Sequence, residues 1–140
     1  MTIKEIQEEI IEDFDLFEDW MQRYEFIIEN GKSLPKIEEI NKSDDNLIKG
    51  CQSKVWVHAD YEDGKLLFTA DSDAILTKGI ISLLLRVYND QTPDDILGVD
   101  PYFIDSIGLK EHLSPTRANG LLSMVKRIKL LALAHKSKNG

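Results

Sequence analysis

Apolar residues recur at helical spacing through most of the first thirty positions, which predicts two helices there. After a capping box at the N-terminus, isoleucines follow the helical period as far as about Glu12. Asp13 or Asp15 can cap a second helix, and we expect this helix to end at Gly31. The apolar stripe of the second helix consists of Leu16, Trp20, Tyr24, Ile27 and Ile28. We interpret both stripes as faces that pack into a core.

The apolar period changes from helical to strand-like in the middle of the chain. Apolar and polar residues alternate over 54–61, as in a half-buried strand. Asp63-Gly64 is a hairpin signal, and residues 65–70 return as a second strand. Two strands alone are marginally stable in water. We therefore expect helices to cover this ribbon, or a third strand to join it from a segment that the pattern does not identify, and the fold to be mixed.

An almost wholly apolar segment, residues 74–88, predicts a central helix, because a helix that is apolar on every side has to be buried. The sequence Asp-Ser-Asp at 71–73 precedes it and is expected to supply its cap. Gly79 lies inside this helix, where a glycine costs about 1 kcal/mol relative to alanine. We expect this glycine to permit the close approach of another backbone.

The C-terminal third of the chain predicts two short helices and one long helix. Capping residues followed by proline mark the short helices, at about 94–97 and 101–107. Ser114-Pro115 opens the last helix, which we expect to run to about His135. The residues expected to face inward from it are Leu121, Leu122, Val125, Ile128 and Ala132.

Length and charge narrow the class of protein. The chain has 140 residues and a net charge of -8, and we interpret residues 1–140 as a single domain. Acidic residues dominate positions 1–30, and basic residues dominate from Lys110 onward. We exclude nucleic acid as a partner, because phosphate binding requires a concentrated basic surface. The two charge sets are either solvated helix faces or a surface for a protein of complementary charge.

Hydropathy and cysteine usage predict a soluble, cytoplasmic protein that does not enter a membrane. No apolar run approaches the length of a membrane span, and the first residues lack the basic-then-apolar pattern of a secretion signal. One cysteine can form neither an internal disulfide nor a zinc or iron-sulfur site of several cysteines from this chain. A reducing compartment is therefore expected. We expect no cofactor and no metal.

That single cysteine, Cys51, is the first candidate for chemistry. It lies between Gly50 and a β-branched run that begins at Val55, so we expect a thiol presented at a turn before a strand. Gly50 permits backbone angles that other residues resist. A thiolate is a strong nucleophile if its site is reachable and stabilises negative charge. The alternative interpretation is that Cys51 is a small buried hydrophobic residue.

Arg117 is the second candidate, because it contradicts a local rule. It falls in the first turn of the last predicted helix, where the helix dipole disfavours a cation. A rule broken at one residue often indicates a functional site. The alternative is a plain ion pair with one of the many acidic residues.

Three separated motifs together resemble the signature segments of the SufE family over nearly the whole chain. They are Gly50-Cys51-Gln52-Ser53-Lys54-Val55-Trp56, then Asp71-Ser72-Asp73-Ala74 leading to Lys78-Gly79, and Leu113-Ser114-Pro115-Thr116-Arg117 with Gly120-Leu121. Their order and spacing match the family as well. Thr116 departs from the serine that is common there, but it keeps the hydroxyl group.

The resemblance implies a sulfur-transfer protein of iron-sulfur cluster assembly rather than an enzyme in its own right. Its partner would be a pyridoxal-phosphate cysteine desulfurase of the SufS or CsdA type, whose turnover it would enhance. Cys51 would accept the persulfide sulfur and pass it to a SufBCD-type scaffold. Gly50, Asp73 and Arg117 would support Cys51. The resemblance also implies an α+β fold with a small antiparallel sheet, of about three strands, flanked by helices as in SufE and IscU. A homodimer and a monomer both remain open.

Two further functions stay open beside this one. A cysteine hydrolase would pair Cys51 with His58, His112 or His135 as the base. An adaptor would bind a desulfurase through its acidic helices and carry no sulfur. Asp73 has a second interpretation too, as an ordinary helix cap. For the cysteine itself we hypothesise two arrangements of its loop, one sheltered by neighbours such as Leu47, Val55 and Trp56 and one turned outward.

Overall fold

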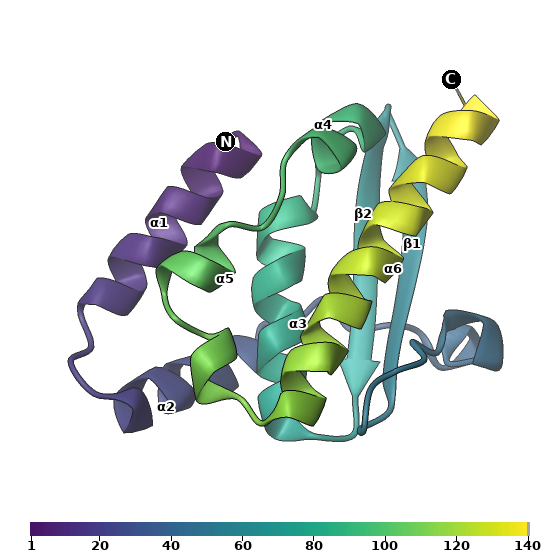
Figure 1. Cartoon of the computed structure of the whole chain (residues 1–140). Coiled ribbons are helices and arrows are strands. Elements are labelled where there is room, and N and C mark those ends of the chain that lie inside the picture. The colour runs from purple at the N-terminus through teal and green to yellow at the C-terminus, as the bar shows by residue number, and fades with distance from the viewer. Residues whose placement is uncertain (140) are drawn as a thin grey trace.

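A β-hairpin and six α-helices make up the fold of residues 1–139, which the computed structural model describes (Figure 1). The hairpin lies on one side of the molecule and most of the helices on the other. The helices are α1 (Ile3–Asp15), α2 (Trp20–Gly31), α3 (Ile75–Tyr88), α4 (Pro93–Gly98), α5 (Phe103–Ser106) and α6 (Pro115–Asn139), and the strands are β1 (Val55–Glu62) and β2 (Lys65–Ser72).

The hairpin confirms the predicted strand pair and its turn. The strands β1 and β2 are antiparallel and pair from Val55 with Ser72 to Glu62 with Lys65. Asp63 and Gly64 take φ values of 53° and 80°, as a two-residue turn with positive φ at both positions requires. The α+β class is therefore as expected.

The sheet of residues 1–139 has two strands, not the expected three or so. Within these residues, three isolated bridges join other segments to the hairpin without extending into a strand, and they pair Lys36 with Ala70, Leu47 with Trp56 and Gln91 with Leu66. At the first of these, Pro35 accepts a hydrogen bond from the Ala70 N–H but cannot donate one to a sheet. Helices instead cover the ribbon, with α3 against β2 and α6 against β1.

Helix α3 is central, as its apolar sequence predicted (Figure 1). Its residues Ile81, Leu83, Leu84 and Leu85 are fully buried, and it contacts β2, α1, α2 and α6. Gly79 has the predicted use, because a Cβ on it would overlap the carbonyl oxygen of Ile27 in α2. The buried apolar residues form one core cluster, whose members range in sequence from Ile3 to Ala132.

The predicted start of α2 and one predicted inward position of α6 are wrong. Helix α2 begins at Trp20, and its cap is Asp19, whose carboxylate accepts a hydrogen bond of 2.8 Å from the Gln22 N–H. Leu16 therefore lies outside α2, where it is the C-cap of the longer α1 and is 78% exposed. In α6, Leu122 is 50% exposed, because Met124 takes the inward position beside Leu121 and Ile128.

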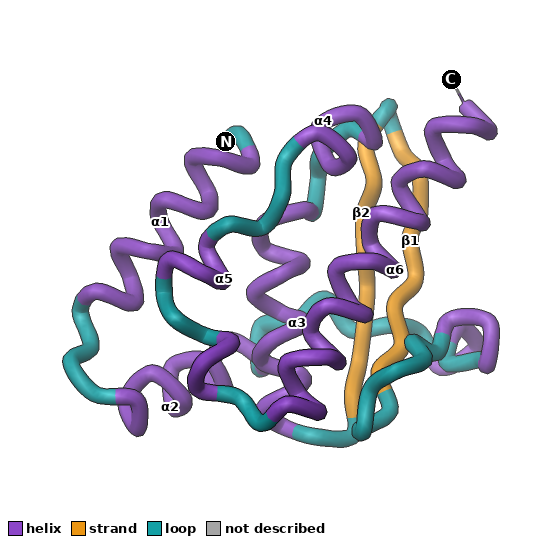
Figure 2. The backbone as a smooth tube through the Cα atoms, viewed as in Figure 1, coloured by secondary structure: helices purple, strands orange, loops and turns teal. Residues whose placement is uncertain are grey.

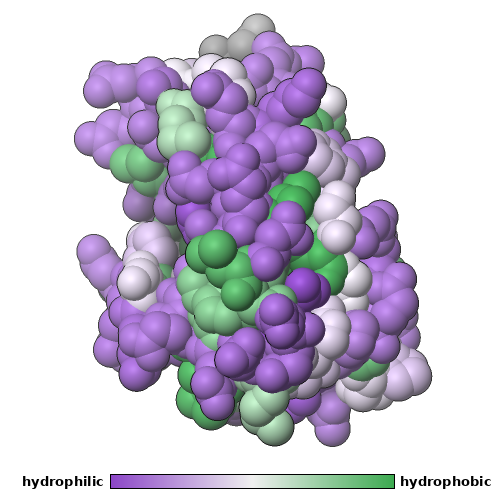
Figure 3. Space-filling model, turned by 90° about the vertical axis from the view of Figure 1, so that its left-hand side faces the viewer, coloured by the Kyte–Doolittle hydropathy of each residue, from purple (hydrophilic) through white to green (hydrophobic). Residues whose placement is uncertain are grey.

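The acidic N-terminal helices mostly face solvent. Figure 3 shows this side of the molecule, where hydrophilic residues surround a smaller apolar area. Two of the acids, Glu9 and Asp13 of α1, pair with Arg86 of α3 at 2.5 and 3.2 Å and so fasten α1 to the central helix. No helix among residues 1–139 combines the length and the hydropathy that crossing a membrane requires.

Candidate functional site

Cys51 lies in a short loop whose ends are tied together. The Cys51 loop, residues 49–54, connects Ile48 to the start of β1, and the Ile48 N–H donates to the Val55 carbonyl at 2.8 Å. Figure 2 shows the long connection from α2 reaching this point at the end of the hairpin where α6 begins. Gly50 has φ of +93°, a left-handed conformation that glycine adopts readily, as expected from its place before the cysteine. The loop thus brings the sulfur to α6.

The Cys51 sulfur is half-buried against α6. Its Sγ lies 3.5 Å from the Gly120 carbonyl oxygen, to which the thiol donates a weak hydrogen bond. A cavity of about 10 Å³ adjoins the sulfur, and its other walls include Thr77 and Ile80 of α3 and Met124 of α6. Such a space holds about one water molecule. The sulfur is therefore partly sheltered, with space beside it for about one small molecule of the size of water.

The cover over the sulfur differs from the cover that the sequence predicted. Leu47, Val55 and Trp56 are not among the residues that line this cavity. Val55 instead points into the core as the first residue of β1, and Trp56 takes the opposite face of the strand. The shelter comes from α3 and α6, elements distant in sequence.

Burial raises the pKa of the Cys51 thiol above its ordinary value. Desolvation has this effect because it disfavours the charged thiolate. The sulfur is therefore protonated near neutral pH in this arrangement, which agrees with its donating a hydrogen bond to Gly120. Since the thiolate is the reactive species, the closed loop holds a weak nucleophile.

Arg117 lies at the same cavity, so the structure brings two predicted site residues together. Its backbone N–H donates to Ser114 Oγ at 3.3 Å, which caps the first turn of α6. Its side chain is exposed and forms no ion pair with a carboxylate of residues 1–139, so the plain ion-pair interpretation is wrong. A positively charged side chain therefore lines the same cavity as the sulfur.

Asp73 is not a helix cap. Helix α3 begins at Ile75, so its cap position is Ala74, and Ala74 makes no side-chain capping bond. The Asp73 carboxylate accepts a hydrogen bond of 3.0 Å from the Lys54 N–H, and the Asp73 N–H donates to the Lys54 carbonyl at 3.2 Å. Asp73 thus holds the downstream end of the Cys51 loop against the end of β2.

Sequence reasoning missed the part that the second turn of α6 plays. Gly120 belongs to the third motif, but no residue near it in the sequence indicates that the Cys51 sulfur packs on it. A Cβ on Gly120 would lie 3.4 Å from Sγ, which is ordinary van der Waals contact. The signal available in the sequence is the pair of small residues Gly120 and Ser123, three positions apart on one helix face.

The structure gives a cysteine hydrolase no base. None of the three histidines lines the Cys51 cavity. His58 contacts Asp60 at 3.1 Å, and His112 stacks on Trp20 with ring centres 3.8 Å apart. His135 stacks on Tyr61 and lies fifteen residues beyond Gly120, roughly 22 Å along the helix at its usual rise. Residues 1–139 also contain no group of three His, Cys, Asp or Glu side chains placed to hold a metal.

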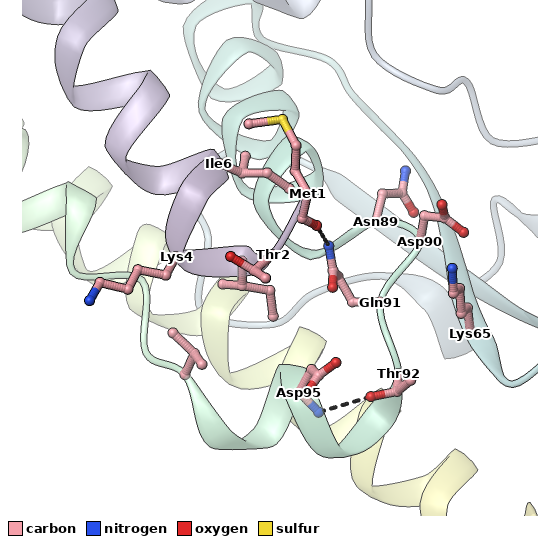
Figure 4. Close-up of a pocket in the computed structure, with 12 residues that line it drawn as sticks. Met1, Thr2, Lys4, Ile6, Lys65, Asn89, Asp90, Gln91, Thr92 and Asp95 are labelled. Carbon is pink, nitrogen blue, oxygen red and sulfur yellow. Dashed lines mark hydrogen bonds between the residues drawn. The ribbon is translucent and has the colours of Figure 1, made fainter.

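A larger cavity, of about 600 Å³, lies away from the sulfur (Figure 4). It is formed by the start of α1, the first residue of β2 and the segment after α3. Gln91 spans part of it, with its Nε2 donating to the Met1 carbonyl at 3.2 Å. Its walls include neither cysteine nor histidine, so it offers no thiol that could carry sulfur.

Comparisons with known proteins agree with the motifs. Residues 8–132 match the model of the SufE family, described as an Fe-S metabolism associated domain. A SufE-like protein of Rhizobium meliloti is 41% identical over 127 residues, which cover 87% of this chain and 91% of that protein. A SufE-like protein of Synechocystis is 40% identical over 125 residues, or 89% of this chain and 79% of that protein.

A solved structure resembles the fold. The solution structure of a hypothetical protein from Thermus thermophilus superimposes with a TM-score of 0.78 and covers 94% of this chain and 96% of that one. At 23% sequence identity this likeness concerns the fold alone.

Proposed function

The chain belongs to the SufE family and has a role in Fe-S metabolism, and from this premise we propose that Cys51 accepts sulfur from the persulfide of a cysteine desulfurase. One observation carries the proposal: the Cys51 sulfur lies half-buried on a loop, and its cavity is lined by an exposed Arg117 that forms no ion pair with a carboxylate of residues 1–139. A carrier needs a thiol that is sheltered at rest and reachable by a second protein.

The transfer is a thiol exchange that needs no oxidant. The Cys51 thiolate attacks the terminal sulfur of the partner's persulfide, so that a new S–S bond forms on Cys51. The S–S bond within the partner breaks, and the electron pair leaves with the partner's cysteine as a thiolate. The number of S–S bonds stays the same. The proton that Cys51 carries at rest goes to solvent or to that leaving thiolate.

This chain contributes the position of the sulfur and one positive charge. Opening the Cys51 loop removes the burial that raises the pKa of the thiol, and more thiolate forms as a result. Arg117 would then lie within reach of the thiolate and of the persulfide anion that follows. Gly50 and Asp73 set the geometry of the loop.

The proposal extends to what lies beyond the site. The chain acts as one SufE-like domain, enhances the turnover of a SufS-like desulfurase by removing its sulfur, and delivers that sulfur to a SufB-containing scaffold. We place this exchange in the cytoplasm, because a reducing compartment keeps the Cys51 thiol available.

Intact mass spectrometry tests the central step. After incubation with a pyridoxal-phosphate cysteine desulfurase and cysteine, we expect the protein to gain the mass of one sulfur atom, and fragmentation to place it on Cys51. Reduction should remove the added mass. A protein that gains no sulfur, or gains it at another residue, contradicts the proposal.

The variant Cys51→Ser separates a carrier from an adaptor. It removes the sulfur and keeps a small polar side chain in the loop. If the protein is a carrier, the variant should gain no sulfur and should lose its stimulation of the desulfurase. If stimulation persists in the variant, the protein is an adaptor.

A further inference from the structure

The Cys51 loop rests on one face of α6. Gly120, Ser123 and Arg127 follow one another at intervals of three and four residues, so they lie on the same side of the helix. The sulfur packs on Gly120, as described above. A Cβ on Gly50 would lie 2.7 Å from Ser123 Oγ, so the loop backbone contacts the helix there as well. Because Gly120 and Ser123 are small, the loop can pack closely against the surface of α6.

Arg127 continues this face, and its guanidinium binds the chain just before the loop. Its Nη1 donates to the Asp45 carbonyl at 3.1 Å and its Nη2 to the Leu47 carbonyl at 2.9 Å. A guanidinium presents its donors in a rigid fork, so two carbonyls are held at a fixed separation. Asp45 belongs to a 3-10 helix, Asp44–Asn46, and the contact therefore fastens that helix and the start of the loop to α6.

Besides the bond from Ile48 to Val55 that joins its ends, the loop is held at each end by a different element. Arg127 of α6 holds the upstream end, at Asp45 and Leu47. Asp73, after β2, holds the downstream end through Lys54. Each contact is polar and partly or wholly exposed, so water competes for it. Contacts of this kind can break without disturbing the core.

We infer that Arg127 is a positioning residue, which keeps the Cys51 sulfur in its sheltered place by fixing the upstream end of the loop to α6. It touches neither the sulfur nor the cavity beside it. Its effect is to lower the fraction of molecules in which the loop has left α6. Loss of the two hydrogen bonds from Arg127 should therefore expose the thiol while the core stays folded.

Opening of the loop changes the titration of the Cys51 thiol. Burial raises the pKa of Cys51, so the closed loop holds the proton more tightly than an open one does. Closure is fully favoured below the ordinary thiol pKa and weakens as the pH rises above it. The charged side chain at the cavity is Arg117 of α6, whereas the lining residues Thr77 and Ile80 of α3 are uncharged. A variant that opens the loop should lower the pH at which the thiol reacts.

Alkylation of Cys51 by iodoacetamide tests the inference, with intact mass as the readout across a range of pH. We expect Arg127→Gln to react about tenfold faster than the wild type, the change that corresponds to losing a contact of about 1.4 kcal/mol. The midpoint of its pH profile should move down toward the ordinary thiol value. Its thermal unfolding midpoint should fall by no more than the several degrees that this loss implies, so that the core remains folded during the assay.

Two companion variants make the result specific. Arg127→Lys keeps the charge but loses the fork, so we expect a reaction rate between those of the wild type and Arg127→Gln. Lys126→Gln removes a positive charge from the neighbouring, exposed position of α6 and should react like the wild type. A folded Arg127→Gln with the wild-type rate and pH midpoint would overturn the inference, as would a Lys126→Gln that reacts equally fast.

The importance of this positioning for sulfur transfer rests on the proposed function, but alkylation needs no desulfurase. If Arg127→Gln exposes the thiol and the wild type never gains sulfur from a desulfurase, the proposed function fails and the positioning role stands. If the wild type gains sulfur on Cys51 and Arg127→Gln alkylates at the wild-type rate, the positioning role alone fails.

Discussion

Glycine brings two backbone segments together at two places in this molecule, and the two contacts differ in kind. Gly79 of α3 meets Gly31 and Ile27 of α2, and a Cβ on Gly31 would lie 3.0 Å from the Gly79 nitrogen. Gly120 of α6 meets the Cys51 loop, where a Cβ would lie 3.4 Å from the sulfur, an ordinary contact distance. The first contact joins two helices in the core. The second joins a helix to a loop at the surface.

The difference shows how one small fold combines a rigid part with a part that can open. At Gly79 the contact includes Ile27, which is fully buried, and separation of the two helices would expose it to water. Around Gly120 the loop is held by hydrogen bonds from Arg127, from the thiol and to Asp73. Each such bond contributes only about 1 kcal/mol net. Opening the loop is therefore far less costly than separating α2 from α3.

Gly79→Ala should have the largest effect on stability. The added methyl group would overlap the Ile27 carbonyl, and overpacking of this kind costs about 2 kcal/mol even after the better helix propensity of alanine is included. Urea denaturation followed by circular dichroism measures the change. Gly98→Ala is the matched control, since a Cβ there meets no atom within 4 Å. A wild-type stability for Gly79→Ala would mean that α2 and α3 separate more easily than the packing indicates.

Gly50→Ala should have the next largest effect, concentrated in the Cys51 loop. Its φ of +93° is strained by about 1–2 kcal/mol for a residue with a Cβ, and that Cβ would lie 2.7 Å from Ser123 Oγ. Opening the loop relieves both, so the rate of Cys51 alkylation should rise about tenfold. Gly64→Ala carries a similar backbone strain, at φ of +80°, in the distant hairpin turn. If Gly64→Ala accelerated alkylation equally, the effect would not be local to the loop.

Asp73→Ala should cost about 1 kcal/mol, because the Lys54 N–H loses its carboxylate acceptor. We expect hydrogen exchange over residues 49–54 to accelerate several-fold, with the exchange of α3 unchanged. Asp73→Asn keeps a side-chain oxygen that can accept the same bond, and it should stay near the wild type. Faster exchange throughout α3 would instead restore the helix-cap interpretation.

Gly120→Ala should change stability little, and in the opposite direction. Its methyl group would contact the sulfur at an ordinary distance, and alanine in a helix is favoured over glycine, so we expect a gain of about 0.5 kcal/mol. The methyl group also narrows the space beside the sulfur. A loss of stability comparable to that of Gly79→Ala would show that the two glycine contacts are alike after all.

Arg117→Ala should have the smallest effect on stability, since its side chain is exposed and unpaired within residues 1–139 and the helix dipole disfavours a cation there. Sulfur gain from a desulfurase should nevertheless slow about tenfold, because the persulfide anion loses a charge-assisted contact. Arg117→Lys, which keeps the charge, should recover part of the rate. Thermal unfolding and the time course of sulfur gain together separate the two effects. An unchanged rate would remove Arg117 from the site.

Local patterns were enough to predict most of the elements. The hairpin turn at Asp63-Gly64 and the central place of α3 follow from residues that are neighbours in sequence, because turn conformation and helix amphipathicity are local properties. The close approach at Gly79 could be expected for a similar reason, since a glycine in an otherwise apolar helix needs an explanation. The start of α2 was misplaced because several acids were equally good caps, and only packing selected Asp19.

The site was predictable in its central residue and not in its surroundings. Cys51 could be found because it is the one cysteine of the chain, and Arg117 because it breaks a helix rule. The role of Asp73 could not be predicted, since its partner Lys54 lies 19 positions away and the bond forms only when the hairpin has paired. The contacts of Gly120, Ser123 and Arg127 with the loop depend in the same way on where α6 crosses the hairpin.

The amino-acid sequence alone thus establishes the family and the mixed class, and it identifies Cys51 as the candidate sulfur acceptor, since each follows from a motif or a local period. The protonated, half-buried state of that sulfur is a property of the folded protein, because it arises when α3 and α6 remove water from one side of the Cys51 loop. Contacts between segments some 70 to 80 positions apart hold the loop there, such as those at Gly120 and Arg127. No local pattern encodes such contacts, because their energy depends on the packing of the whole core.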